Sequence, residues 1–222
     1  EIPGGLVIAA YPEREDPTDV YIGGPSAPKW GEGKGARVGT SSLRRLIQLR
    51  QAWPDSVGVP LRGNVGTRLK RLAEGKVDGL ILAAAGLKRL DLDDVPREAL
   101  DVERMVPAPG QGALAIEARP DRKDLLATLL RVDHASTRLA VECERAFMKA
   151  MGGGCRSPLG AFGWVEGEDL RMRFFWSDPE GRRPVRGFSV RKASSVAPEA
   201  HAQTLKRKVL EEAAKLSGEA AG

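Results

Sequence analysis

Three strand-then-helix units follow one another between residues 36 and 90, and they constrain the fold more than any other feature of the chain. The predicted strands are short apolar runs at residues 36–39, 57–61 and 77–84. The segments after the first two strands carry apolar residues three and four positions apart, which is the period of an amphipathic helix. Strands that alternate with helices pair in parallel, because each helix returns the chain across the sheet. We therefore expect an α/β fold with a parallel sheet.

A different pattern occupies the C-terminal part of the chain. A long helix is predicted over residues 134–150, with Cys143 and Phe147 on its apolar face. Three strand-like stretches follow, at residues 159–165, 169–176 and 184–191. A final amphipathic helix has an apolar face made of Leu205, Val209, Ala213 and Leu216. These elements predict a small, separate α+β domain.

The net charge of the chain indicates which kinds of ligand it favours. The net charge is +5 and the sequence pI is about 9.4, a balance that favours anionic ligands. No stretch approaches 18 uncharged apolar residues, so we expect no membrane span. Cys143 and Cys155 are too few for a disulfide-stapled secreted scaffold, and with two histidines they form no zinc pattern. The cytoplasm is the expected compartment.

The turn after the first predicted strand combines hydroxyl side chains with two arginines. Thr40, Ser41 and Ser42 stand where the helix must begin, and such side chains accept hydrogen bonds from the first backbone amides. Arg44 and Arg45 follow at once, although a cation there opposes the helix dipole at a cost of about 0.3–1 kcal/mol. Capping explains the hydroxyls without explaining the arginines. For Arg44 and Arg45 we therefore prefer the interpretation as an anion-binding site to that of solvated surface charges.

Arginines recur at the neighbouring turns. Arg62 and Gly63 lie in the turn after the second strand, and Arg68 stands just inside the helix that follows. Arg89 comes after the third strand in the corresponding place. Open α/β sheets bind ligands beyond the carboxyl ends of their strands, and guanidinium groups suit carboxylate or phosphate oxygens. The sequence therefore predicts that this sheet edge binds an anion.

The two cysteines are expected to differ. Cys143, on the apolar face of its helix, is predicted to be a small buried hydrophobe. Cys155 stands in a loop after three glycines, which permit close approach of a ligand, and the neighbouring Arg156 favours the thiolate. Chemistry alone leaves two interpretations of Cys155 open: an incidental loop residue, which is commoner, and a nucleophile.

Five stretches of the chain together resemble motifs of the porphobilinogen deaminase (hydroxymethylbilane synthase) family. They are Val-Gly-Thr-Ser-Ser-Leu-Arg-Arg at 38–45, Leu-Arg-Gly-Asn-Val-Gly-Thr-Arg at 61–68, Ala-Gly-Leu-Lys-Arg-Leu at 85–90, Pro-Gly-Gln-Gly-Ala at 109–113 and Gly-Gly-Cys at 153–155. They occur in family order and at family-like spacing across essentially the whole chain. Five ordered matches are far more specific than any one of them.

The resemblance implies a three-domain architecture, with α/β domains similar to the lobes of periplasmic binding proteins and a small C-terminal α+β domain. Residues 1–12 and 113–131 would be the remnant of the first α/β domain. Residues 13–112 would form the second, which binds the anion and cofactor, and residues 132–222 the α+β domain with the cofactor cysteine. The family also suggests a monomer.

By the same resemblance, Cys155 carries a dipyrromethane cofactor through a thioether that the enzyme itself makes. The other cofactor-binding residues would be Thr40, Ser41, Ser42, Arg44, Arg45, Arg62, Gly63 and Arg68. The substrate-binding residues would be Arg62, Arg68 and Arg89. Four molecules of porphobilinogen would be joined head to tail, each losing ammonia, and the linear tetrapyrrole hydroxymethylbilane released by hydrolysis. This chemistry needs no metal or redox cofactor.

The chain departs from the family at its start. The family's proton-transfer aspartate belongs to a Lys-Asp-x-Pro stretch, which the resemblance places just before Glu1, and no carboxylate here matches it. We expect an incomplete form of the enzyme, unable to turn over alone. The alternative is a non-catalytic anion-binding module of the periplasmic-binding-protein type. A nucleic-acid binder is poorly supported, because only 5% of residues are aromatic and the arginines occupy separate turns.

Overall fold

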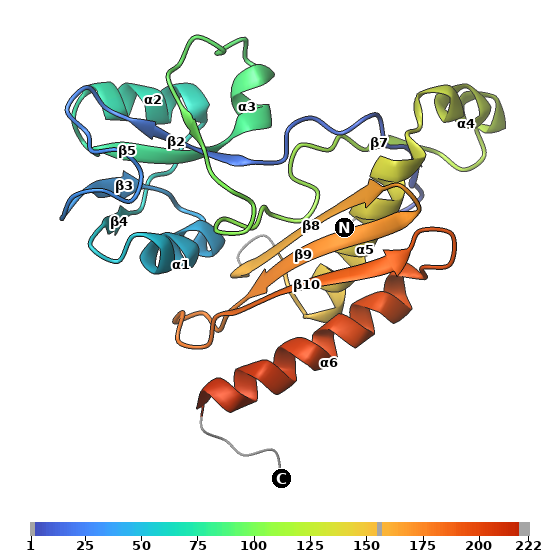
Figure 1. Ribbon diagram of the computed structural model, residues 1–222. Coiled ribbons are helices and arrows are strands. Elements are labelled where there is room, and N and C mark those ends of the chain that lie inside the picture. The colour runs from blue at the N-terminus through green and yellow to red at the C-terminus, as the bar shows by residue number, and fades with distance from the viewer. Residues whose placement is uncertain (1–2, 155–156, 218–222) are drawn as a thin grey trace.

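The computed structural model describes residues 3–154 and 157–217, and Figure 1 follows the chain from blue to red. Two bodies of regular structure are joined by long connecting segments. The strands are β1 (Val7–Ala10), β2 (Asp19–Gly23), β3 (Arg37–Gly39), β4 (Val57–Val59), β5 (Gly79–Ala83), β6 (Glu98–Ala99), β7 (Ile116–Ala118), β8 (Leu159–Glu166), β9 (Asp169–Trp176) and β10 (Val185–Lys192). The helices are α1 (Leu43–Ala52), α2 (Val65–Ala73), α3 (Ala84–Lys88), α4 (Lys123–Leu129), the 3₁₀ turn η1 (Leu130–Val132), α5 (Ala135–Ala150) and α6 (Pro198–Ser217).

The larger sheet has the strand order β4-β3-β5-β2-β6. β3 pairs in parallel with both β4 and β5, which confirms the parallel arrangement expected for the three strand-then-helix units. β2, which the sequence analysis missed, lies antiparallel between β5 and β6. The mixed α/β class is thus confirmed, with one antiparallel strand inside the sheet.

Both faces of this sheet are covered. Along β2, Val20 and Ile22 belong to one buried apolar cluster and Tyr21 to another, as the two-residue period of a strand requires. Leucines of α2 and α3 complete the first cluster, and Leu49 and Trp53 at the end of α1 complete the second. Strands covered on both faces read as continuous apolar runs, which explains the composition of β5.

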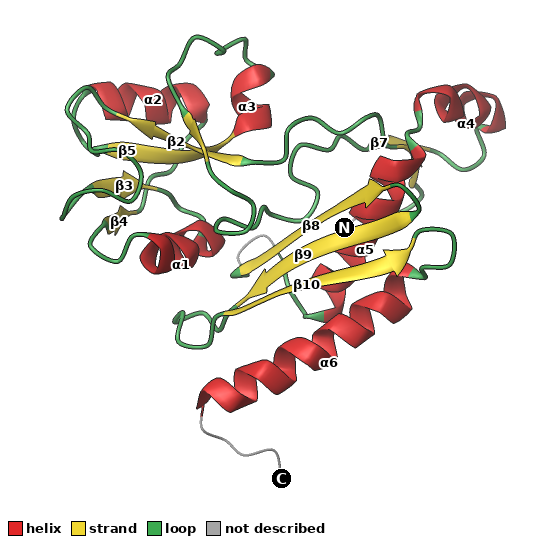
Figure 2. Cartoon of the chain, in the orientation of Figure 1, coloured by secondary structure: helices red, strands yellow, loops and turns green. Residues whose placement is uncertain are grey.

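The C-terminal sheet is antiparallel, in the order β10-β9-β8, and α5 and α6 cover one of its faces (Figure 2). Phe147 of α5, Met172 of β9 and Val209 of α6 are fully buried in the core between them. The predicted strands and the α5 helix are confirmed to within one or two residues. α1 of the larger body packs against this sheet through Ile47, which contacts Phe175 and Val106.

A third, two-stranded sheet pairs β1 with β7. Two segments, residues 11–18 and 100–115, connect it with the larger sheet (Figure 1). They are bonded to each other where Glu15 N donates to Gly112 O over 3.2 Å. Gly112 has φ +84°, and a Cβ there would lie 2.4 Å from Glu15 O, so the close approach of the two segments requires glycine. Throughout the described ranges, no helix combines the length and apolar composition needed to cross a bilayer.

Candidate anion site at the carboxyl edge of the sheet

The turns that carry the predicted site residues lie at one edge of the larger sheet. β3, β4 and β5 run in the same direction, so the segments that follow them leave the sheet on the same side. β2 runs the opposite way, and its first residue, Asp19, pairs with Ala83 at the end of β5. An antiparallel strand thus brings its beginning to the edge where its neighbours end. Asp19 therefore joins the arginines at this edge.

The start of α1 shows how the hydroxyls are used. Ser42 is the N-cap, with extended backbone angles, and its Oγ accepts a long 3.4 Å hydrogen bond from Arg45 N. Thr40 is buried, and its Oγ1 accepts from Ser42 N over 3.2 Å. Ser41 is exposed. Helix capping therefore accounts for Ser42, and a hydrogen bond within the turn accounts for Thr40.

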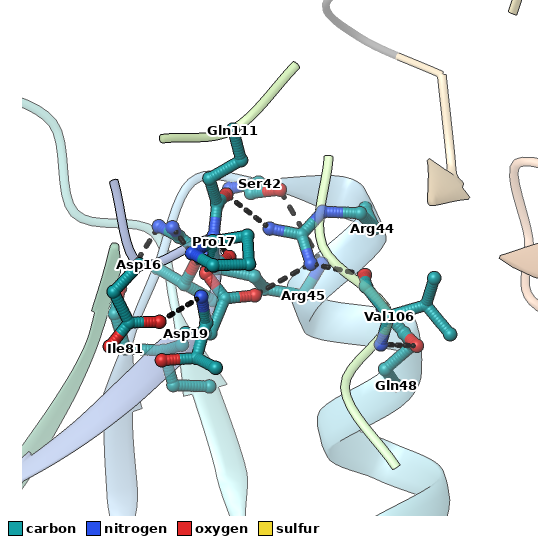
Figure 3. A network of polar contacts seen from close by, with 12 residues as sticks. Asp16, Pro17, Asp19, Ser42, Arg44, Arg45, Gln48, Ile81, Val106 and Gln111 are labelled. Carbon is teal, nitrogen blue, oxygen red and sulfur yellow. Dashed lines mark hydrogen bonds and ion pairs between the residues drawn. The ribbon is translucent and has the colours of Figure 1, made fainter. Parts of the chain in front are cut away.

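Arg44 and Arg45 converge on the carboxylate of Asp19, as Figure 3 shows. Arg44 Nη1 donates to Asp19 Oδ2 over 2.6 Å. Arg45 reaches Asp19 Oδ1 with Nε at 3.0 Å and Nη2 at 2.7 Å, and its Nη1 donates to Ile81 O. All three side chains are buried, and Asp19 has no exposed surface. The two arginines are thus held from the inside of the fold, a feature that the sequence analysis did not anticipate.

Asp19 is ionised in this setting. Burial by itself raises the pKa of a carboxyl group, but attraction to Arg44 and Arg45 and their hydrogen bonds outweigh it and lower the pKa of Asp19 below its ordinary value. One carboxylate facing two guanidinium groups leaves a net charge of +1. The centre therefore stays cationic although all three groups are buried.

The second connecting segment is bonded to the same centre. Gln111 Nε2 donates to Asp19 Oδ1 over 2.9 Å and to Pro17 O over 2.7 Å, and its Oε1 accepts from Arg44 over 3.3 Å. Val106 O accepts from Arg44 Nη1 over 2.6 Å. The position of the segment is thus coupled to the orientation of the arginine pair.

Arg62 and Arg68 are without a carboxylate partner in the part of the chain that the structure describes. Arg62 is exposed, and Arg68 donates from Nε to Gly63 O over 2.8 Å. Gly63 itself has φ +120°, which favours glycine. Burial, followed by repulsion from Arg45, lowers the pKa of Arg68. The positive charge of Arg45 therefore acts on Arg68, which places the two cations in one electrostatic environment.

Arg89 lies elsewhere on its helix than expected. The sequence predicts Arg89 just inside the helix after the third strand, in the place that corresponds to Arg68, but β5 ends at Ala83 and α3 begins at once at Ala84. Arg89 is therefore the C-cap of α3, and its Nη2 donates to Gly112 O over 2.8 Å. The contact joins Arg89 to the connecting segment, with one backbone acceptor as its partner among the described residues.

Cys155 lies outside the described residues. Before it, Gly153 N donates to Met148 O, and Gly154 N donates to Ser157 Oγ over 2.9 Å. After it, β8 lies against the connecting segment, where Ala161 N donates to Pro107 O. That segment also supplies the carbonyl of Val106 to Arg44. The described start of β8 thus adjoins a segment bonded to the arginine centre.

Cys143 is buried, as predicted, with 1% of its surface exposed. Burial raises the pKa of its thiol to about 12, so the thiol remains protonated at neutral pH. Within the described ranges, no three His, Cys, Asp or Glu side chains are arranged to hold a metal ion.

Sequence reasoning missed Asp19 and Gln111. Asp19 heads the apolar run Val20–Ile22 directly after a charged turn, and a single carboxylate at the head of a buried strand is a usable signal. Gln111 lay in a quoted motif but received no role. Nothing in a single sequence pairs it with residues that lie 92 and 94 positions away.

Comparison with known proteins gives two family matches. Residues 1–127 match "Porphobilinogen deaminase, dipyromethane cofactor binding domain", and residues 138–215 match "Porphobilinogen deaminase, C-terminal domain". A porphobilinogen deaminase of Roseiflexus sp. (strain RS-1) is 45% identical over 193 residues, which are 87% of this chain and 63% of that protein. One of Ralstonia nicotianae is 48% identical over 186 residues, covering 83% of this chain and 56% of the relative. The chain therefore spans less than two thirds of the length of either relative.

Among solved structures, an arginine-specific periplasmic binding protein of Salmonella typhimurium is similar at 16% identity, over 57% of each chain, with a TM-score of 0.37. A likeness at that level supports no inference about this chain.

Proposed function

Since this chain belongs to the porphobilinogen deaminase family, we propose that the protein condenses four porphobilinogen molecules head to tail into hydroxymethylbilane on a dipyrromethane primer held by Cys155. The observation that carries the proposal is the cationic cluster at the sheet edge. There, Arg44 and Arg45 keep a net positive charge around Asp19. The charge of Arg45 also acts on Arg68, which has no carboxylate partner among the residues that the structure describes.

The cluster fits a dipyrromethane. Each of its pyrroles carries an acetate and a propionate side chain, so the group is a polyanion, and guanidinium groups bind carboxylates by paired hydrogen bonds. We assign its binding to Thr40, Ser41, Ser42, Arg44, Arg45, Arg62, Gly63 and Arg68. We assign the incoming porphobilinogen to Arg62, Arg68 and Arg89. When bound, the dipyrromethane supplies the free pyrrole carbon from which the product grows.

The reaction is a substitution repeated four times. In each cycle the C–N bond of the porphobilinogen aminomethyl group breaks and ammonia leaves. The methylene carbon would then bond to the free pyrrole carbon that a bound dipyrromethane supplies, a proton would leave that carbon, and water would finally release the tetrapyrrole. The arginines neutralise the carboxylates of the growing product. Asp19 is unsuited to protonate the leaving nitrogen, because it is buried and its pKa is lowered.

We also propose the three-part division of the chain. Residues 13–112 contain the larger sheet, and residues 132–222 contain the C-terminal sheet with α5 and α6. Residues 1–12 and 113–131 contain the β1–β7 pair and α4, a helix whose residues are all described and none of which is buried. A two-stranded sheet is marginal by itself, which supports assigning this part to a larger α/β domain. The proposal includes a monomeric state, which the family resemblance implies, and the cytoplasm, which is the compartment expected from the sequence.

Intact mass tests the covalent anchoring. The protein expressed from its natural coding sequence should be heavier than its polypeptide by two linked pyrroles, and Cys155→Ser should lose that increment. Cys143→Ala is the matched control, because Cys143 is buried and should not carry the group. The preparation should also consume porphobilinogen and release ammonia in equal amounts. A protein that is active without the increment would contradict the anchoring.

The same experiment separates the alternative, a non-catalytic anion-binding module. Such a module would bind porphobilinogen or another polycarboxylate and show neither the mass increment nor the release of ammonia. No feature of the described structure favours nucleic acid as the ligand, since the arginines occupy separate turns at one sheet edge.

A further inference from the structure

Asp19 makes more contacts than a simple ion pair would require. Its Oδ2 accepts from Arg44, and its Oδ1 accepts from two nitrogens of Arg45 and from Gln111, all at 2.6–3.0 Å. Because these donors converge on one carboxylate that has no exposed surface, Asp19 fixes one side of both guanidinium groups (Figure 3). The planes of the two groups are thus set before a ligand arrives.

The position of the arginines makes such a partner necessary. Arg44 and Arg45 lie in the first turn of α1, where the helix dipole is unfavourable for cations and where no acidic residue is present. Both are buried, so their mutual repulsion is little screened by water. One carboxylate placed between them offsets half of this charge and leaves the rest for an anionic ligand.

We propose that Asp19 is a positioning residue for the carboxylates of the cofactor and substrate, acting through Arg44 and Arg45. This role rests on the proposed function. Asp19 touches no ligand in this scheme. It holds the two guanidinium planes in the orientation that ligand carboxylates require and limits their joint charge to +1. Gln111 supports the same geometry from the connecting segment.

A purely structural carboxylate would have a different signature. If Asp19 served stability alone, cofactor occupancy in its variants would follow their stability. If Asp19 positions the arginines by its charge, occupancy should follow the charge instead. Asp19→Asn preserves the volume and removes the charge, whereas Asp19→Glu keeps the charge but must fit an extra methylene into a packed site.

The experiment measures both quantities in the protein expressed from its natural coding sequence. Cofactor occupancy is read from intact mass, and stability from the urea midpoint. We expect occupancy in Asp19→Asn to fall by about tenfold, the effect of losing one charge-assisted hydrogen bond. Asp19→Glu should keep occupancy close to wild type even where its midpoint is the lower of the two. Asp78→Asn is the matched control, because Asp78 pairs with Arg37 at the opposite end of β3 and should retain full occupancy.

Each result has a defined meaning. Two results would overturn the positioning role and leave the proposed function standing. One is a folded Asp19→Asn protein with wild-type cofactor occupancy. The other is a cofactor occupancy that simply follows the urea midpoint in both variants. If Asp19→Asn does not fold, Asp19→Glu decides alone, and a tenfold loss of occupancy in it overturns the role. Wild-type protein without the two-pyrrole increment overturns the proposed function and, with it, the role of Asp19.

Discussion

Two buried carboxylates of this molecule, Asp19 and Glu144, are held in different ways. Asp19 faces two guanidinium groups at the edge of the larger sheet. Glu144 of α5 faces one, Arg14, whose Nη1 lies 2.6 Å from its Oε1. Backbone amides complete the second site, since Gly110 N and Gly163 N donate to Glu144 over 2.6 and 2.7 Å. Neither carboxylate has exposed surface.

The difference lies in the balance of charge. Around Glu144 one carboxylate meets one guanidinium, so the centre is neutral and closed, and it joins α5, β8 and both connecting segments. Around Asp19 a positive charge is left over. The pKa values follow the same division: burial raises the pKa of Glu144 against the opposition of Arg14, whereas two arginines lower that of Asp19. The neutral buried pair at Glu144 therefore suits a structural contact between elements, whereas the buried centre at Asp19, with its surplus positive charge, suits a site that binds an anionic ligand.

The largest predicted effect comes from removing one arginine from each centre. Arg14→Met leaves Glu144 without a cation, and breaking a buried pair in this way should cost about 3–5 kcal/mol of unfolding free energy. Arg44→Met leaves Asp19 with Arg45 and Gln111 and also relieves the repulsion between the arginines. Its cost should be smaller, about 1.5–3 kcal/mol, the range for hydrogen bonds to a charged group. Urea denaturation of both variants measures the difference.

The control for these two variants is an exposed pair. Arg119→Ala removes a surface contact with Asp121 and should leave the urea midpoint unchanged. Equal losses of unfolding free energy in Arg14→Met and Arg44→Met would contradict the proposed difference between the two centres. They would show that Arg45 does not stabilise the charge of Asp19 once Arg44 is removed.

The elements of the fold could be predicted where a local pattern decides them. The helix α5 and the strands β8, β9 and β10 have continuous apolar periodicity bounded by turns, and their ends agree with the prediction to within two residues. β2 was not predicted, because a five-residue strand that follows a charged, proline-bounded turn is too short to show a clear hydrophobic periodicity. Its antiparallel insertion depends on contacts with β5, some 60 residues further along the chain. Such pairings are invisible to local periodicity.

The site could likewise be predicted only where local sequence and strand direction determine it. Arginines beyond the strands of a parallel sheet could be expected at one edge, because strand direction alone brings those turns together. The internal partner of Arg44 and Arg45 could not, since Asp19 reaches them only through the strand order of the folded sheet. Sequence reasoning therefore found the cations and missed the carboxylate that compensates one of them.

The pH dependence of stability should separate the two carboxylates by sign. The lowered pKa of Asp19 means that its contribution is complete above the unfolded value, near 3.9, and is lost as the pH falls through the folded value. The advantage of wild type over Asp19→Asn should therefore shrink on acidification. The raised pKa of Glu144 means that its ionisation costs stability above the unfolded value, near 4.3. The advantage of wild type over Glu144→Gln should therefore grow as the pH falls towards that value.

Urea midpoints of the three proteins between neutral pH and about pH 2 test this, because other titrating groups cancel in the differences. Each unit by which a pKa is displaced changes the difference by about 1.4 kcal/mol. Two difference curves with the same slope would show that the second guanidinium does not set the charge state of Asp19.

The smallest effect concerns the caps of the two helices that carry the site arginines. Asn64 caps α2 with a 2.8 Å bond from Thr67 N, whereas Ser42 caps α1 with a bond of 3.4 Å. Asn64→Ala should cost about 1 kcal/mol, and Ser42→Ala should lie at the low end of the range for caps, about 0.5 kcal/mol. If Ser42 also binds the cofactor, Ser42→Ala should lower occupancy by more than this small loss of stability explains, as measured by intact mass beside the urea midpoint. A Ser42→Ala protein that is less stable than Asn64→Ala yet fully loaded with cofactor would make Ser42 a cap alone. The carboxylates of the cofactor would then be bound by the arginines without help from the Ser42 hydroxyl.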